Sequence, residues 1–408
     1  MPWYHGWNIV IAGLVFQAIS FGIGIYCFTF WVAPWSAEFG VGRGDIMLVF
    51  FTLQVSMGLL APFAGQAMDR LSVRALVCTG AVSLAVALVL AARATALWQL
   101  VVLYGSLVVG GTLLAGPLAA QTLTARWFGR RRGLALGIST VGTSIGGFLL
   151  PPLVTRLQSA MGWREANDVL ALLVVVAVVP LVWVVVRNQP DPSERSVEFL
   201  PSPQSTNPGQ APESLNRVWT VRMVFREPVF WLTVIAFTLF AAINGGLQQN
   251  LAPYGLDQGF DAQATAWVVS VMALVMAVWK VVIGALADRL DIRWIFLFSL
   301  MILLLAMMWM STAPAYLEFA IICAMLGVAA AAHLPLLAAI VSRHFGIASF
   351  GLVMGLLGPF TTLSAMGPVL AGMIRDSTGS YDMALLVLGC LGAPILAVMM
   401  MLRLGPPR

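Results

Sequence analysis

The sequence predicts an all-α membrane protein with twelve transmembrane helices arranged as two pseudo-symmetric six-helix bundles. The first observation is composition: 60% of the 408 residues are hydrophobic and 10% are charged, whereas soluble domains carry about 25% charged residues. The second is an internal repeat. The pattern Gly65–Arg74 (GQAMDRLSVR) recurs 219 positions later as Gly284–Arg293 (GALADRLDIR). We interpret the chain as two copies of one membrane domain.

The predicted spans are stretches of about 20 or more mainly apolar residues, the length needed to cross the hydrocarbon core. Six precede a polar break in the chain and six follow it. They are 7–31, 46–67, 75–92, 97–125, 133–157, 169–186, 229–252, 264–287, 294–311, 315–341, 350–374 and 383–402.

The distribution of basic residues predicts the orientation. With both termini in the cytoplasm, most of the 22 Lys and Arg residues fall in cytoplasmic loops, as the positive-inside rule requires. We therefore expect a multi-pass protein of the cell (inner) membrane whose first span acts as its own insertion signal. The net charge of +5 reflects this loop bias, so we predict no nucleic-acid partner.

Domain boundaries follow from the polar break. We predict an N-terminal six-helix half at 1–187, a flexible cytoplasmic linker at 188–227 rich in Pro, Ser and Asn, and a C-terminal half at 228–408. We expect the protein to be a monomer in the lipid bilayer.

The two copies of Gly-x-x-x-Asp-Arg-x-x-x-Arg resemble the signature loop of the major facilitator superfamily. Two further segments, Ala125–Gly147 (ARWFGRRRGLALGISTVGTSIGG) and Ser342–Gly355 (SRHFGIASFGLVMG), resemble its monocarboxylate-transporter-like branch, which includes the oxalate/formate antiporters. The resemblance implies a secondary carrier that works by alternating access of its two halves.

In the resembled superfamily, the signature loops lock the cytoplasmic ends together in one conformation. The resemblance therefore implies gating roles for the loop residues Asp69, Arg70, Arg74, Asp288, Arg289 and Arg293. The alternative is a solvated turn, but acidic and basic residues recur at the same place in both halves.

Glycines three to five positions apart recur in the fifth and eleventh predicted spans. Such spacing lets a neighbouring helix approach the backbone closely, so we expect packing seams at Gly133, Gly137, Gly142, Gly146 and Gly147, and at Gly351, Gly355, Gly358, Gly367 and Gly372.

No residue set in the sequence predicts catalysis, a metal site or a cofactor. The acidic residues fall in loops, in the linker or at span ends, and no nucleophile and base can be assembled in the spans. The cysteines lie one by one in apolar spans. We therefore predict no enzymatic activity.

Lys280 is the leading candidate for a substrate contact. It is the only lysine of the chain and lies within an apolar span, about 12 Å along the helix from Asp288 and so near the midplane. Ionisable groups at this depth are costly and usually functional. In the resembled family this position carries an arginine, and some members place an acid one turn earlier, where this chain has Met276. The alternatives are pairing with a fixed acid or exposure to lipid.

The remaining candidates are polar residues within the spans. His333 is deep but could simply bond a backbone carbonyl. Asn244 and Gln248 flank Gly245 and Gly246, where we expect a helix interruption that exposes backbone groups to a cavity. A further set could contact substrate or cross-link helices: Gln17, Tyr26, Tyr104 and Gln121.

Together these features predict a transporter of a small organic anion, and the resemblance suggests a monocarboxylate. No Asp or Glu lies in the interior of the predicted spans, away from their ends, so low dielectric should favour the neutral Lys280 amine until a carboxylate arrives with a proton. Proton symport is therefore favoured over exchange for a counter-anion. Efflux of hydrophobic compounds or drugs is an alternative, as is a non-transporting membrane sensor.

Overall fold

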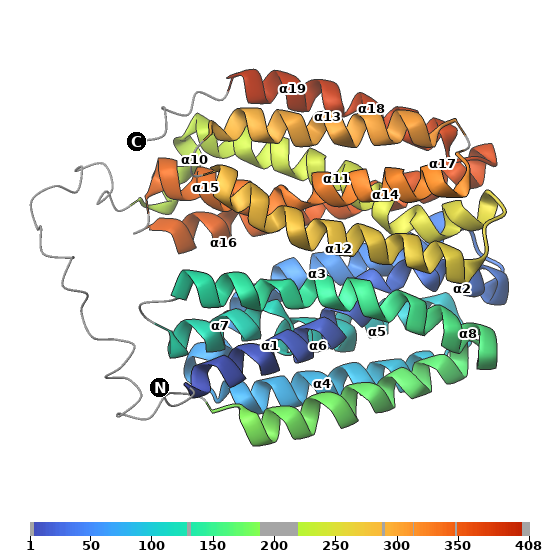
Figure 1. Cartoon of the computed structure of the whole chain (residues 1–408), viewed down its shortest axis with the longest axis horizontal. Helices are drawn as coiled ribbons and strands as arrows, with labels where there is room; N and C mark the ends of the chain where they lie inside the picture. Colours follow the sequence, from blue (N-terminus) through green and yellow to red (C-terminus); the bar gives the residue numbers. More distant parts are fainter. Residues whose placement is uncertain are drawn as a thin grey trace, which may run out of the picture. The chain divides into compact units, whose positions relative to one another are not determined.

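The computed structural model describes residues 4–128, 132–187, 219–287, 290–312, 314–346 and 349–401, and this part of the chain is helical with short connections (Figure 1). It contains 11 helical stretches long and apolar enough to cross a membrane, of which one, Ala135–Val185, has 51 residues. That stretch is about 77 Å long at 1.5 Å per residue, enough for two passes. The predicted all-α fold with twelve spans is confirmed.

The fifth and sixth predicted spans form one continuous helical stretch, α8 (Arg132–Val185), which turns at Gly162. Gly162 has φ 87°, a conformation that favours glycine. Near this turn Arg164 donates to the carbonyls of Ala92 and Ala94 at 2.9 and 3.0 Å, whereas Val185 at the other end accepts from the ring of His5. The helix therefore doubles back across the unit (Figure 1).

The chain divides into two compact units. Unit 1 comprises Met1–Gly40 and Thr52–Thr206, and unit 2 comprises Val41–Phe51 and Asn207–Arg408. We predicted residues 41–51 within the N-terminal half, but they group with unit 2. The first turns of α3 (Arg43–Arg70) therefore belong to unit 2 and the remaining turns to unit 1. Residues 188–218 of the predicted linker lie outside the described part.

Unit 1 is built from helices that pack side by side. Besides α8 and the later turns of α3, it contains α1 (His5–Phe21), the π-helical Gly22–Tyr26, the 3₁₀ turn Phe28–Phe30, α2 (Val32–Phe39), α4 (Val73–Ala91), α5 (Leu97–Leu103), the π-helical Tyr104–Val108, α6 (Val109–Leu114) and α7 (Pro117–Trp127).

Unit 2 repeats this plan after a short amphipathic entry helix. It contains α10 (Val221–Arg226), α11 (Pro228–Asp257), α12 (Ala262–Ala287), α13 (Ile292–Met310), α14 (Tyr316–Ala331), α15 (His333–Phe345), α16 (Phe350–Thr361), the 3₁₀ turn Thr362–Ala365, α17 (Met366–Thr378), α18 (Asp382–Cys390) and α19 (Gly392–Met401).

The predicted glycine seams are present over part of each helix. A Cβ added at Gly142 or Gly146 of α8 would collide with the backbone of α1, and one added at Gly367 of α17 would collide with the backbone of α11. Gly137 and Gly355, in contrast, face open space. The seam prediction is therefore correct for Gly142, Gly146, Gly367 and Gly372 and wrong in this structure for Gly137, Gly355 and Gly358, which have no heavy atom within 4 Å of an added Cβ.

The predicted interruption at Gly245 and Gly246 is absent from the described helix. α11 runs continuously from Pro228 to Asp257. A Cβ at Gly246 would lie 3.2 Å from the backbone of Gly367, so this glycine permits close helix packing. Continuous helix also keeps every backbone group hydrogen-bonded in an apolar environment, which outweighs the weak helix propensity of two glycines.

Candidate functional site

The two signature loops share a capping arrangement at equivalent positions. In unit 1, Ser72 is the N-cap of α4, and its hydroxyl accepts from the amide of Ala75 at 3.3 Å. In unit 2, Asp291 is the N-cap of α13, and its carboxylate accepts from the amide of Arg293 at 2.9 Å. Side chains of both types bond amides that the first helical turn leaves unpaired. The last residue of each loop therefore stabilises the start of the next helix.

A second pair of equivalent contacts, from an arginine to a backbone carbonyl, lies at the end of the helix that precedes each loop. Arg126, at the end of α7, donates to the carbonyl of Met68 near the end of α3 at 2.5 Å. Arg343, at the end of α15, donates to the carbonyl of Ala287, the last residue of α12. Each guanidinium therefore neutralises the negative end of a helix beside the signature loop. Sequence reasoning missed these two arginines, although the matched Arg-Trp-Phe and Arg-His-Phe segments contain the signal.

The structure describes the side chains of three of the predicted gating residues, Arg70, Arg74 and Arg293. Arg293 pairs with Asp291 at 2.8 Å, and this hydrogen-bonded contact holds the pKa of the Asp291 carboxyl below its ordinary value. The guanidinium of Arg74 lies 4.1 Å from the ring centre of Trp183, and Arg70 is exposed. The side chain of Asp69 and residues Asp288 and Arg289 lie outside the described part, so their gating roles stay predictions.

Lys280 lies on the protein-facing side of α12. Met276 and Ile283, one turn before and after it, are buried, whereas Val278 and Val281 are more than half exposed. Lys280 itself is half-buried and lies seven residues from the end of α12, or about 10 Å along the helix. The burial of Met276 and Ile283 favours a position facing the protein over one facing lipid.

Space is available on the same side of the helix. Gly284, one turn after Lys280, has no heavy atom within 4 Å of an added Cβ. Side chains on a helix lean toward its N-terminus, so the lysine stem points away from the signature loop and deeper into the span.

His333 lies deeper than Lys280 in the same unit. Its ring packs against Phe237 and Phe240 of α11, with ring centres 5.5 and 6.3 Å apart. It begins α15 and lies about 18 Å along that helix from Phe345 at the loop end. Within the described part of the chain, its Nδ1 atom is buried and has no hydrogen-bond partner.

The structure places the two polar candidates of α11 at different levels. Asn244 and Gln248 are both half-buried and lie about 24 and 30 Å from the start of α11 at Pro228. Asn244 follows Phe240 by one turn and so lies next to the level of His333. Gln248 lies one further turn along α11, about 6 Å closer to Asp257 at the opposite end of the unit.

Most polar candidates in unit 1 are packed inside it. Gln17 is fully buried, and its amide nitrogen donates to the carbonyl of Ser139, which cross-links α1 and α8. Tyr104 is 2% exposed, and its ring packs against those of Phe28 and Trp35, each with centres 5.7 Å apart.

The two tyrosine candidates share one local feature. Tyr26 is buried at the end of the π-helical Gly22–Tyr26, and Tyr104 begins the π-helical Tyr104–Val108. Such wide turns are rare and frequently occur at functional sites. Gln121 of α7, in contrast, is exposed within its unit.

Comparisons with known proteins agree with this architecture. Monocarboxylate transporter 12 of Rattus norvegicus is 23% identical over 407 residues, covering 94% of this chain and 83% of the relative. Monocarboxylate transporter 11 of Mus musculus is 26% identical over 403 residues, covering 94% and 84%. The crystal structure of a bacterial homolog to the human lysosomal transporter Spinster superposes with a TM-score of 0.69 at 13% identity, covering 98% of this chain and 95% of that chain.

The sequence profile of one family matches most of the chain, over residues 14–366 and 259–408. The chain belongs to the Major Facilitator Superfamily and is a multi-pass secondary transporter of a small substrate, not an enzyme.

Proposed function

We propose that this protein transports a small organic anion, a monocarboxylate, and that Lys280 binds the carboxylate. The observation that carries the proposal is the position of Lys280: a cationic side chain on the protein-facing side of a membrane-spanning helix, at the depth where carriers of this type bind substrate. The monocarboxylate transporters among the relatives support the same substrate class.

His333 and Asn244 complete the substrate-binding level in unit 2. The ring of His333 and the amide of Asn244 offer hydrogen-bonding groups near the deeper side of Lys280, and the rings of Phe237 and Phe240 offer apolar surface. A short carboxylic acid has the same division between a charged head and an apolar tail. A cationic substrate would be repelled by Lys280.

Lys280 also supplies a route for proton coupling. A lysine in a low-dielectric span can release its proton, whereas an arginine cannot. The anion and the proton would then enter together and keep the loaded site close to neutral. The positive-inside distribution supports an inner-membrane protein with cytoplasmic termini, which would place the signature loops in the cytoplasm.

A ligand screen tests the substrate class. The thermal midpoint of the purified protein is measured with short monocarboxylates, dicarboxylates, amino acids, sugars and hydrophobic cations, because a ligand that binds only the folded state raises it. We expect monocarboxylates to raise the midpoint and Lys280→Met to remove that response. Stabilisation by hydrophobic cations alone would instead support drug efflux.

A further inference from the structure

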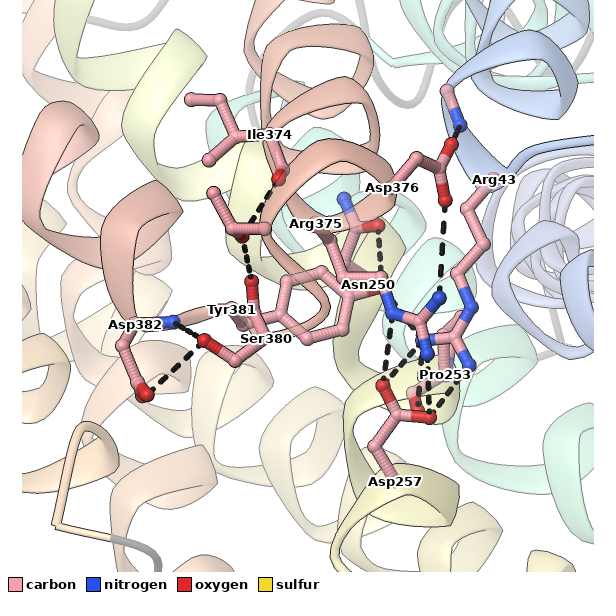
Figure 2. A network of polar contacts seen from close by, with 12 residues as sticks. Arg43, Asn250, Pro253, Asp257, Ile374, Arg375, Asp376, Ser380, Tyr381 and Asp382 are labelled. Atoms are coloured by element: carbon pink, nitrogen blue, oxygen red, sulfur yellow. Dashed lines mark hydrogen bonds and ion pairs between the residues drawn. The ribbon is translucent and has the colours of Figure 1, made fainter.

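Charged side chains converge at the end of unit 2 opposite its signature loop (Figure 2). Arg43 begins α3, Asp257 ends α11, and Arg375 lies in the last turn of α17. These residues belong to one compact unit although they are far apart in sequence. None of them was among the predicted site residues.

Two guanidinium groups bind one carboxylate in this cluster. Arg43 contacts both oxygens of Asp257, at 2.7 and 2.6 Å, and Arg375 contacts the same two oxygens at 3.2 and 3.4 Å. The Arg43 side chain is 12% exposed, and those of Asp257 and Arg375 are each 27% exposed. The carboxylate is therefore held by four N–H groups and remains accessible to water (Figure 2).

Asp257 occupies an unfavourable position on its own helix. It is the last residue of α11, where the helix dipole disfavours a negative charge, and Arg43 is the first residue of α3, where the dipole disfavours a positive one. The pairing between helices therefore offsets two local mismatches.

Neighbouring groups hold the arginines in place independently of Asp257. Arg43 donates to the hydroxyl of Tyr381 at 3.1 Å, and that hydroxyl donates to the side-chain oxygen of Asn250 at 3.1 Å. Asp376 accepts from the amide of Gly44 at 2.7 Å and lies 3.9 Å from Arg375. The arginine positions are thus built into the unit.

We propose that Arg43 and Arg375 form a second carboxylate-binding site, distinct from Lys280, which the chain's own Asp257 occupies in this structure. A free monocarboxylate takes the place of Asp257 when that side chain moves away. The planar guanidinium fork bonds both oxygens of a carboxylate, which chloride cannot reproduce. The site would collect organic anions at the end of the unit opposite the signature loop.

Chemical rescue with formate tests this site. The experiment uses the full chain carrying Lys280→Met, which removes any response from the proposed central site, and compares it with the same chain carrying Asp257→Ala. We expect Asp257→Ala to lower the thermal midpoint and about 50 mM formate to restore roughly 2 °C of it relative to equal chloride. Adding Arg375→Gln should abolish this restoration.

Two outcomes would overturn the proposal: no difference between formate and chloride in the Asp257→Ala chain, or an equal formate response after Arg375→Gln. Asp257→Ser, which also vacates the carboxylate position, is measured in the same way in case the alanine variant does not fold. Because every variant lacks Lys280, failure of this test leaves the proposed central site unaffected, and its success does not depend on that site.

Discussion

Arg126 and Arg343 occupy equivalent places and bond equivalent carbonyls, those of Met68 and Ala287, next to the two signature loops. A family-based interpretation concentrates on the loop residues themselves. The structure adds that the loop is fixed from both sides: an arginine of α7 or α15 bonds the end of the preceding helix, and Ser72 or Asp291 caps the following one.

Loss of the arginine contact should destabilise the unit. We expect Arg343→Gln to lower the free energy of unfolding by roughly 1.5–3 kcal/mol, because the helix-terminal carbonyl loses a bond to a charged donor. The exposed Arg156 provides the control, since Arg156→Gln should change stability little. Denaturant unfolding in detergent measures both, and equal effects would contradict the capping role.

The two helix caps should differ in their pH dependence. Because hydrogen bonding to Arg293 lowers the pKa of Asp291 in the folded state, its contribution is present above the unfolded-state pKa and is lost as pH falls. Asp291→Ala should therefore cost about 1 kcal/mol near pH 7, and this cost should fall progressively as pH drops below about 4 and through the lower folded-state pKa. Ser72→Ala should cost a similar amount at both pH values. A cost of Asp291→Ala that persists in acid would contradict this assignment.

At the scale of helices, the sequence predicted span positions well because length and hydropathy determine them. It also predicted a break between the spans 133–157 and 169–186, and the turn at Gly162 lies in that break. It did not predict that both spans form one helical stretch, α8. It also predicted an interruption at Gly245 and Gly246 that the structure lacks, because the sequence pattern does not distinguish a glycine that breaks a helix from one that admits a neighbouring backbone.

Packed and open glycines should respond differently to one methyl group. Gly367→Ala places a Cβ against the backbone of α11 and should cost roughly 1–3 kcal/mol of stability, whereas Gly355→Ala meets open space and should be neutral or slightly stabilising. Thermal unfolding of the two variants compares them directly. A larger loss for Gly355→Ala would show that the described packing is not the dominant one.

At the scale of the whole molecule, both units follow the sequence repeat, whereas the proposed substrate site uses residues that are not repeated. Lys280 could be identified from the sequence because a lone lysine in an apolar span is conspicuous, and its protein-facing position required the exposure of Val278 and Val281. The cluster at Asp257 could not be predicted, because Arg43 and Asp257 meet only through the tertiary fold.

Coupling to protons is a property of the complete carrier in a sealed membrane. If Lys280 carries the proton, an inside-alkaline pH gradient should drive uptake into proteoliposomes that contain no internal anion, and Lys280→Arg should weaken this response because arginine keeps its proton. Uptake that requires an internal anion and ignores the gradient would support anion exchange instead.

Uptake of a radiolabelled monocarboxylate by proteoliposomes containing Lys280→Met tests the central claim most directly. The control is Val281→Met, the same replacement residue at the exposed neighbouring position. We predict that Lys280→Met lowers initial uptake by roughly 100-fold, as expected for loss of a buried charge contact, while the protein remains folded and Val281→Met transports normally. Uptake by Lys280→Met at the wild-type rate would contradict the assignment of Lys280 as the substrate-binding cation.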